Sequence, residues 1–203
     1  MIVVTSIKRI SQDCVQLTLS VGSCFFLRLS YLTRVLPEVV DEGLELSDMD
    51  LEDLTNAGFA YNAERAALSC LERSEHSRFI LLTKLRRKGF ALQSINTALD
   101  FLEEKGLLND TRYAEAWLRN RSISHAEGRT KLISELCARG VDRKTAEKAV
   151  SDYFDIVGED FVLQRAIEKC RRLGKSAEEA RRYLARKGFS PLKVKNSIDR
   201  LWH

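Results

Sequence analysis

One short motif occurs three times in this chain and limits what the chain can fold into. It reads LRRKGF, LCARGV and LARKGF, with its glycine at Gly89, Gly140 and Gly188, 51 and then 48 positions apart. A glycine just past a helix adopts the left-handed conformation without a Cβ clash, so the next amides can bond to the last helical carbonyls. The apolar residue after it is expected to fold back onto that helix. Each motif therefore predicts a corner that ends a helix.

Apolar residues recur at the same distances from each corner glycine. They stand eight and four positions before it and six, ten and thirteen positions after it, as at Leu81, Leu85, Ile95 and Leu99 around Gly89. Steps of four and three positions place such residues on one face of a helix. Each corner is therefore expected to join two amphipathic helices.

Polar residues that cap helices stand where these helices are expected to begin. Asp142 and Ser190 follow the second and third corners, whereas Ala91, after the first corner, is a weaker cap. Ser176 and Glu179 form a capping-box sequence before the third corner.

A further helix is expected before each pair, beginning at Tyr61, at Asn109 and near Asp160. Stacked units of this size contact mainly their neighbours. We therefore expect a mainly α fold in which three tandem three-helix repeats form an elongated, curved array, with boundaries at 61–107, 108–157 and 158–203.

Residues 1–60 follow a different period. In CVQLTLS the apolar Val15, Leu17 and Leu19 alternate with polar residues, and Ile2–Ile10 and Cys24–Leu29 show a similar pattern. A small three-stranded antiparallel β meander is expected there. After this meander in the sequence, Ser47 and Asp50 resemble a capping box at the start of a short acidic helix that begins at Met49.

The composition and motifs exclude several classes of protein. No apolar run is long enough to span a membrane, and the first residues lack the features of a signal peptide, so a cytoplasmic protein is expected. The five scattered cysteines indicate reduced, mostly buried thiols rather than a metal or disulfide site. His76, His125 and His203 are expected on the surface, and neither a phosphate-binding glycine loop nor HExxH occurs. We expect no enzyme, no cofactor and no metal.

Positive charge is concentrated toward the C-terminal end. The net charge is +4, but residues 1–60 hold 4 basic and 9 acidic side chains, whereas residues 158–203 hold 12 and 6. This asymmetry favours an acidic or phosphate-rich partner. The candidate contact residues are Lys84, Arg87, Lys88, Arg119, Arg121, Arg171, Arg172, Arg181, Arg182, Arg186, Lys187, Lys193 and Lys195.

Simpler interpretations account for part of this pattern. A solvated helix face, with cations favoured near helix C-termini, explains about half of these residues without a partner. The first corner also resembles a helix-turn-helix, although no repeat presents a clear run of base-reading residues. Trp117, Tyr113 and Phe101 are expected in the core rather than as stacking platforms for bases.

The second repeat resembles a known family, the RecX regulatory proteins of bacteria. NDTRYAEAWLRNR resembles the family signature through Asp110, Tyr113, Ala114, Trp117 and Arg121, and the run GRTKLISELCARGV continues the match. LRRKGF, GLLND and LARKGF add to it, so that the resemblance extends over residues 61–203.

The resemblance implies a non-enzymatic protein that binds the RecA recombinase filament on DNA and inhibits its ATP hydrolysis, strand exchange and co-protease activity. It implies a monomer whose contact with DNA is weak and electrostatic, and no membrane partner. Two alternatives stay open at this stage: a DNA-binding protein that acts without the recombinase, and a helical adaptor for another acidic partner.

Overall fold

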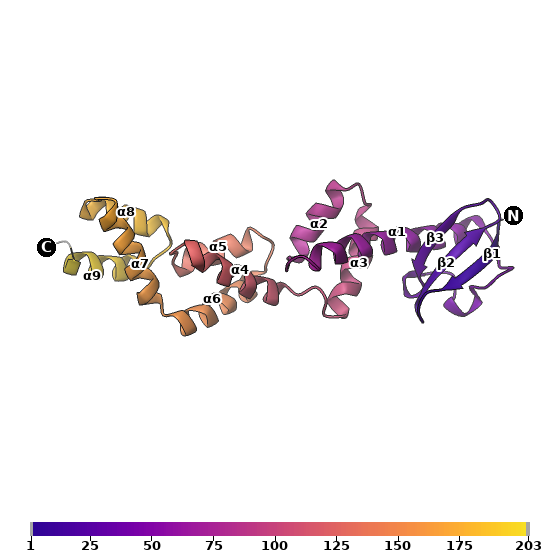
Figure 1. Cartoon of the computed structure of the whole chain (residues 1–203), viewed down its shortest axis with the longest axis horizontal. Coiled ribbons are helices and arrows are strands. Elements are labelled where there is room, and N and C mark those ends of the chain that lie inside the picture. The colour runs from indigo at the N-terminus through magenta and orange to yellow at the C-terminus, as the bar shows by residue number, and fades with distance from the viewer. Residues whose placement is uncertain (1, 202–203) are drawn as a thin grey trace. The chain divides into compact units, whose positions relative to one another are not determined.

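The structure is a computed structural model that describes residues 2–201 and divides into two compact units. Unit 1 contains residues 2–76 and 80–108, and unit 2 contains residues 77–79 and 109–201. Within the described residues, a small antiparallel sheet is followed by nine α-helices (Figure 1). The predicted fold class, mainly α with a small antiparallel sheet in front, is confirmed.

The sheet in unit 1 contains the predicted meander and one further strand. Strands β1 (Ile2–Arg9), β2 (Cys14–Leu19) and β3 (Cys24–Arg28) pair in sequence, and β4 (Glu45–Leu46) pairs with the outer edge of β1. The fourth strand is too short to show an alternating pattern, so the sequence analysis missed it. Two single 3-10 turns, Leu29–Tyr31 and Pro37–Val39, lie between β3 and β4.

Helix α1 (Asp48–Leu71) corrects the prediction of a short helix at Met49 and of a separate helix beginning at Tyr61. The predicted capping box is present, since Ser47 accepts from the Asp50 amide and Asp50 accepts from that of Ser47. The helix then continues for 24 residues. Gly58 does not interrupt it, because there the missing side chain makes room for the Phe25 ring of the sheet.

A partly buried ionic cluster fixes the sheet to α1. The Arg28 guanidinium of β3 lies 2.5 Å from Glu64 Oε1 in α1 and 3.1 Å from Asp13, and the Tyr31 hydroxyl donates to Glu64 Oε2 at 2.8 Å. The same guanidinium lies 4.1 Å from the centre of the Phe101 ring. Glu64 is only 2% exposed, and these partners supply the counter-charge and the donors that a buried carboxylate needs.

The remaining helices follow the predicted order (Figure 1). They are α2 (Arg78–Arg87), α3 (Leu92–Glu104), α4 (Asp110–Ser124), α5 (Arg129–Cys137), α6 (Arg143–Val157), α7 (Glu159–Arg172), α8 (Ala177–Arg186) and α9 (Pro191–Leu201). The residues predicted eight and four before, and six and ten after, each corner glycine are all buried. At thirteen after, Leu102 is buried whereas Tyr153 and Leu201 are half-buried. The repeat boundaries themselves stay a prediction, and residues 60 and 61 lie inside α1.

The three corners have the predicted backbone geometry. Gly89, Gly140 and Gly188 have φ of +90°, +84° and +81°. In each corner the next amide donates to the carbonyl five residues earlier, over 3.2 to 3.3 Å, and the glycine amide donates to the carbonyl three residues earlier. This double closure is the Schellman arrangement, which satisfies the last helical carbonyls. Of the predicted caps, Asp142 accepts from the Thr145 amide and Ser176 with Glu179 forms a complete capping box.

Two of these corners accept a hydrogen bond from another segment of unit 2, one from a side chain and one from the backbone. The carbonyl before Gly140 accepts from the Ser77 hydroxyl over 2.5 Å, and the carbonyl before Gly188 accepts from the Gly128 amide over 2.8 Å. Ser77 and Gly128 each stand twelve residues before a corner glycine. A Cβ on Gly188 would overlap the backbone of Lys131. Glycine is therefore required at Gly188 by packing as well as by its φ.

Replacing Gly188 by alanine should destabilise unit 2 by about 3 kcal/mol, because left-handed strain and backbone overlap add. Gly174→Ala is the matched control, since Gly174 has φ of +62° but open space around it, and it should cost about 1 kcal/mol. Urea unfolding followed by tryptophan fluorescence measures both, because Trp117 lies in unit 2. Equal losses in the two variants would contradict the close backbone packing.

Candidate functional site

Four of the predicted contact residues are held in ion pairs by unit 2 itself. Arg121 and Lys187 both bind Glu127, Lys193 binds Glu159 and Asp160, and Arg181 lies 2.5 Å from Asp199. An exposed ion pair contributes little and can exchange partners, whereas the pairs of the buried Glu127 are fixed more firmly.

The other predicted residues are exposed and more available. Arg119 and Arg182 make only long pairs, 4.0 Å to Glu115 and 3.7 Å to Glu178. Within residues 2–201, no ion pair is formed by Arg87, Lys88, Arg171, Arg172, Arg186 or Lys195.

Lys84 has a partner that the sequence did not suggest. Its ammonium donates to Nε2 of His76 over 2.5 Å, while Nδ1 of the same ring lies 2.8 Å from the Ser74 carbonyl. This arrangement suits a neutral imidazole that donates through Nδ1 and accepts through Nε2. His76 is only 8% exposed, so its predicted place on the surface is wrong: the loop after α1 turns its ring inward. His125 is half-buried, and His203 lies outside the described residues.

Glu127 is the electrostatic centre of unit 2. It is 2% exposed and lies in the loop between α4 and α5. Arg121 at the end of α4 donates to both of its oxygens, over 2.8 and 3.1 Å, and Lys187 at the end of α8 donates to Oε1 over 3.1 Å. The Gly128 amide then donates to the Lys187 carbonyl. We name this set, Arg121, Glu127, Gly128, Lys187 and Gly188, the α5–α8 junction.

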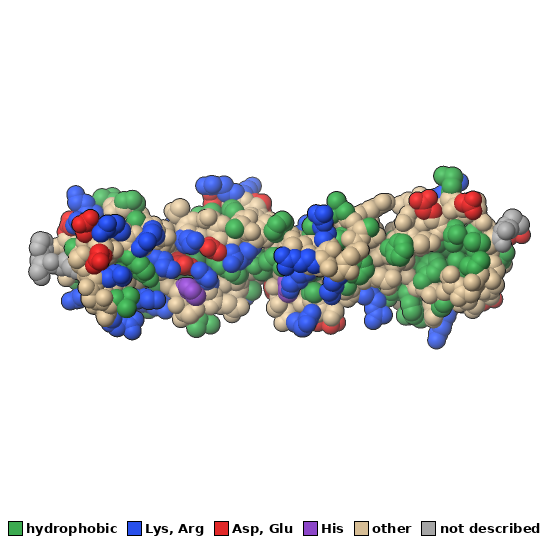
Figure 2. Space-filling model, turned by 90° about the horizontal axis from the view of Figure 1, so that it is seen from above, with side chains coloured by type: hydrophobic (Ala, Val, Ile, Leu, Met, Phe, Trp, Pro, Cys, Tyr) green, Lys and Arg blue, Asp and Glu red, His purple; other side chains and the backbone are tan. Residues whose placement is uncertain are grey.

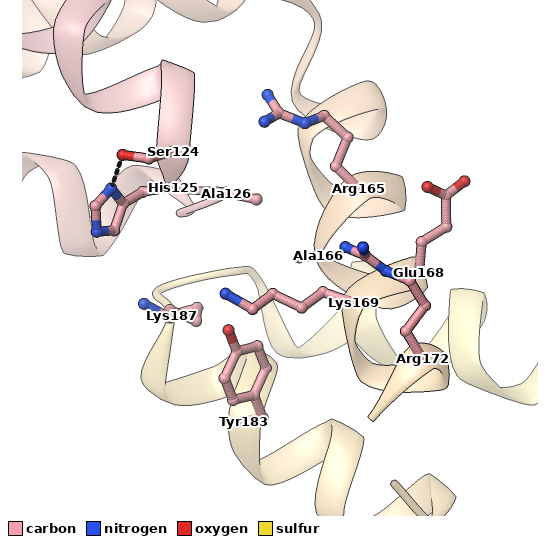
Figure 3. Close-up of a pocket in the computed structure, with 10 residues that line it drawn as sticks. All are labelled: Ser124, His125, Ala126, Arg165, Ala166, Glu168, Lys169, Arg172, Tyr183 and Lys187. Carbon is pink, nitrogen blue, oxygen red and sulfur yellow. Dashed lines mark hydrogen bonds between the residues drawn. The ribbon is translucent and has the colours of Figure 1, made fainter. Parts of the chain in front are cut away.

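A pocket with four Lys and Arg side chains among its ten lining residues lies beside this junction. It has a volume of about 220 Å³, with walls from the end of α4 and its loop, from α7 and from α8. Figure 3 shows the Lys169 side chain extending toward Lys187 and the Tyr183 hydroxyl, with His125 on the opposite wall. We name it the basic pocket; its lining residues are Ser124, His125, Ala126, Arg165, Ala166, Glu168, Lys169, Arg172, Tyr183 and Lys187.

The structure brings two predicted residues, Arg172 and Lys187, into the basic pocket and adds two that the sequence analysis missed. Arg165 and Lys169 stand seven and three positions before Arg172, so the three share one face of α7. The buried Leu163, Ile167 and Cys170 occupy its other side. The four-and-three spacing of Arg165, Lys169 and Arg172 was a readable signal.

The donors of this pocket suit anions. Guanidinium and ammonium groups are strong donors to phosphate and carboxylate oxygens, and a tyrosine hydroxyl adds a neutral donor. Figure 2 shows Lys and Arg side chains distributed over the helical parts of the face seen there, with Asp and Glu among them. Residues 2–201 contain no cluster of His, Cys, Asp or Glu able to hold a metal ion.

The three aromatic side chains predicted in the core and the five cysteines differ in how far they are buried. Tyr113 is buried, whereas Trp117 and Phe101 are half-buried and each lies under an arginine guanidinium. All five cysteines are free thiols, of which Cys14, Cys70 and Cys170 are buried. No helix among the described residues combines the length and apolarity needed to cross a bilayer.

Comparison with known proteins gives consistent matches. A family model described as RecX, second three-helix domain, matches residues 109–150. The regulatory protein RecX of Treponema pallidum (strain Nichols) is 38% identical over 138 residues, which cover 68% of this chain and 84% of that protein. The regulatory protein RecX of Chromohalobacter salexigens is 31% identical over 140 residues, covering 67% and 90%.

Solved structures share the fold. A crystal structure of regulatory protein RecX superposes with a TM-score of 0.76 over 98% of this chain and 100% of that one, at 17% identity. The crystal structure of RecX from Lactobacillus salivarius superposes with a TM-score of 0.60 over 70% of this chain and 96% of that one, at 24% identity.

Replacing Glu127 by glutamine should destabilise unit 2 by about 2 kcal/mol at neutral pH, because Arg121 and Lys187 lose their buried counter-charge. Burial opposes ionisation, but the bonds from Arg121 and Lys187 together outweigh it and hold the pKa of Glu127 below its ordinary 4.5. The contribution of the Glu127 carboxylate to the free energy of unfolding is therefore complete above about pH 5. It is lost as the pH falls through the folded-state pKa, which lies below 4.5.

Urea unfolding of the Glu127→Gln variant at a series of pH values tests this. The stability gap between the unmodified chain and the variant should be constant near neutrality and narrow below pH 4.5. Glu147→Gln, which removes an exposed pair with Arg143, is the control and should have little effect. A gap that did not depend on pH would show that Glu127 acts through its shape alone.

Proposed function

Because the chain belongs to the RecX family of regulatory proteins, we propose that it binds the filament of the RecA recombinase and modulates its activity. Family membership is the observation that carries this proposal. The direction that we propose is inhibition of ATP hydrolysis, strand exchange and co-protease activity, without catalysis by this chain.

Tandem helical repeats are physically suited to a repeating partner. A filament presents the same surface many times, and three similar repeats on one chain can each contribute a weak contact. Linked contacts gain affinity, because after the first has formed the others take place at high effective concentration. Few copies of the regulator per filament would then suffice.

The exposed cations are the proposed contacts with the acidic surfaces of the filament. Arg87 and Lys88 lie on α2 and just after it, and Arg182 and Arg186 lie one turn apart on α8. Their charges are free or weakly paired, so binding a partner would not require a buried ion pair to be broken. Arg121 and Lys187 are weaker candidates for contacts with the filament, because both already form ion pairs with Glu127.

DNA binding without the recombinase is the alternative that one observation favours. The basic pocket provides several cations that a phosphate could engage. Such binding would weaken steeply as salt rises, because each neutralised phosphate releases counterions.

The test is DNA-dependent ATP hydrolysis by a RecA filament, titrated with this protein at fixed salt. The full chain should inhibit at well below one copy per recombinase protomer. The double variant Arg182→Glu, Arg186→Glu should need about tenfold more protein, because two attractive contacts become repulsive. Lys144→Glu, Lys148→Glu, with two exposed cations reversed on α6, is the matched control and should inhibit normally.

Two results would contradict the proposal. No effect on hydrolysis at equal concentrations of the two proteins would exclude filament regulation, and tight binding to naked DNA in the same salt would then favour the alternative. Equal loss in both double variants would assign inhibition to total charge rather than to α8.

A further inference from the structure

The basic pocket holds more positive charge than its own carboxylates balance. Arg165, Lys169, Arg172 and Lys187 line it, and Glu168 is the one carboxylate among its lining residues. Figure 3 shows the Glu168 carboxylate extending away from the ends of Lys169 and Lys187. Cations gathered around one hollow repel each other, so an anion that enters it is stabilised by all of them.

The partners of these four residues define the unbalanced charge. Lys187 is paired with Glu127, which Arg121 shares, and Arg165 donates to the Ser122 carbonyl, a neutral group. Lys169 and Arg172 form no ion pair within residues 2–201. Even if Glu168 and Glu127 are both counted against the four cations, two positive charges are left.

That surplus matches one class of anion. A phosphate monoester carries about −1.5 to −2 charges at pH 7 and three free acceptor oxygens. A phosphodiester inside a nucleic-acid strand carries a single charge, and both of its ester oxygens must continue into the chain. The walls of this pocket come from three segments, α4 with its loop, α7 and α8, which suits a group that enters by one end.

The size of the pocket agrees with this choice. A volume of about 220 Å³ is several times the roughly 30 Å³ that one water occupies in the liquid, so a phosphate group and some of its hydration fit. The polar lining groups are mainly donors: guanidinium, ammonium and the hydroxyl of Tyr183. A carboxylate would fill fewer of them, since it has two oxygens.

We propose that the basic pocket binds a terminal phosphate monoester, either the phosphorylated end of a nucleic-acid strand or the phosphate of a free nucleotide. Arg172 supplies a planar fork for two phosphate oxygens, and Lys169 on α7 and Lys187 after α8 supply point charges. This site is separate from the exposed α8 cations assigned to the filament, and it does not depend on recombinase binding.

The first experiment measures the affinity of the full chain for single-stranded oligonucleotides with no recombinase present. One carries a 5′-phosphate, a second ends in a 5′-hydroxyl, and a third, also with a 5′-hydroxyl, is lengthened until its total charge equals that of the first. A preference of about tenfold for the phosphorylated end over both others is expected from charge-assisted bonds.

Variants assign that preference to the pocket. The double variant Lys169→Ala, Arg172→Ala should lose the preference for the phosphorylated end. Both side chains are exposed, so the fold should be retained. The control double variant Lys144→Ala, Lys148→Ala removes the same amount of charge from α6 and should keep the preference for the phosphorylated end. Adenosine monophosphate and a short polyglutamate peptide, each added as a competitor, separate the sources of the anion.

Each outcome decides the matter. Loss of the preference only in the pocket variant supports the proposal, and competition by the nucleotide then identifies a free nucleotide as a second source. Equal affinity for the phosphorylated strand and the charge-matched strand would overturn it. Competition by polyglutamate as strong as that by the nucleotide would overturn the choice of phosphate and assign the pocket to an acidic protein. Recombinase inhibition by Lys169→Ala, Arg172→Ala is scored separately, so either proposal can fail alone.

Discussion

The structure depends on a backbone conformation that only glycine adopts without strain. At each corner a residue with φ near +85° lets the chain leave one helix and begin the next while the last carbonyls stay bonded. The apolar residue after it then covers the end of the helix that it has left. Because the closure uses main-chain atoms, the same corner tolerates changes around its glycine, as in LRRKGF, LCARGV and LARKGF.

In unit 2 the corner also serves as a packing surface. The carbonyl just before Gly188 accepts from the Gly128 amide, and that before Gly140 accepts from Ser77. A Cβ at Gly188 would overlap the Lys131 backbone and one at Gly140 would overlap the Phe79 side chain, so the glycine that turns the chain also allows neighbouring segments to meet. Glu127 adds charge to this contact through Arg121 and Lys187.

Local features of the sequence predicted local features of the fold. The corners, the capping boxes at Ser47 and Ser176 and the buried faces depend on residues within a few positions, so the chain displays them directly. The length of α1 did not follow, because the Ser47 cap and the apolar spacing from Tyr61 onward predict two helices that the structure joins into one. Strand β4 is defined by its partner in β1 rather than by any pattern of its own.

The candidate site was predicted less well than the fold, since charge in the sequence does not indicate pairing. Lys187 meets Glu127 from 60 positions away, and His76 meets Lys84 only because the loop after α1 turns inward. The face of α7 formed by Arg165, Lys169 and Arg172 was readable from spacing. This face of α7 becomes a pocket only because α8 and the loop after α4 form the opposite wall. Tertiary packing, which the local sequence does not display, places that wall.

Lys187 belongs to two structures at once, because its ammonium lines the basic pocket and also holds Glu127 at the α5–α8 junction. The two sites are therefore thermodynamically linked. An anion that attracts Lys187 away from Glu127 loosens the junction, and by reciprocity any change that tightens the junction weakens the hold on that anion by the same free energy. An anion that leaves the pair intact instead ties α7 and α8 to the loop of α4 and stiffens this half of the protein. Whether a bound anion relaxes or rigidifies unit 2 therefore depends on whether Lys187 leaves Glu127 for the anion or stays bound to Glu127.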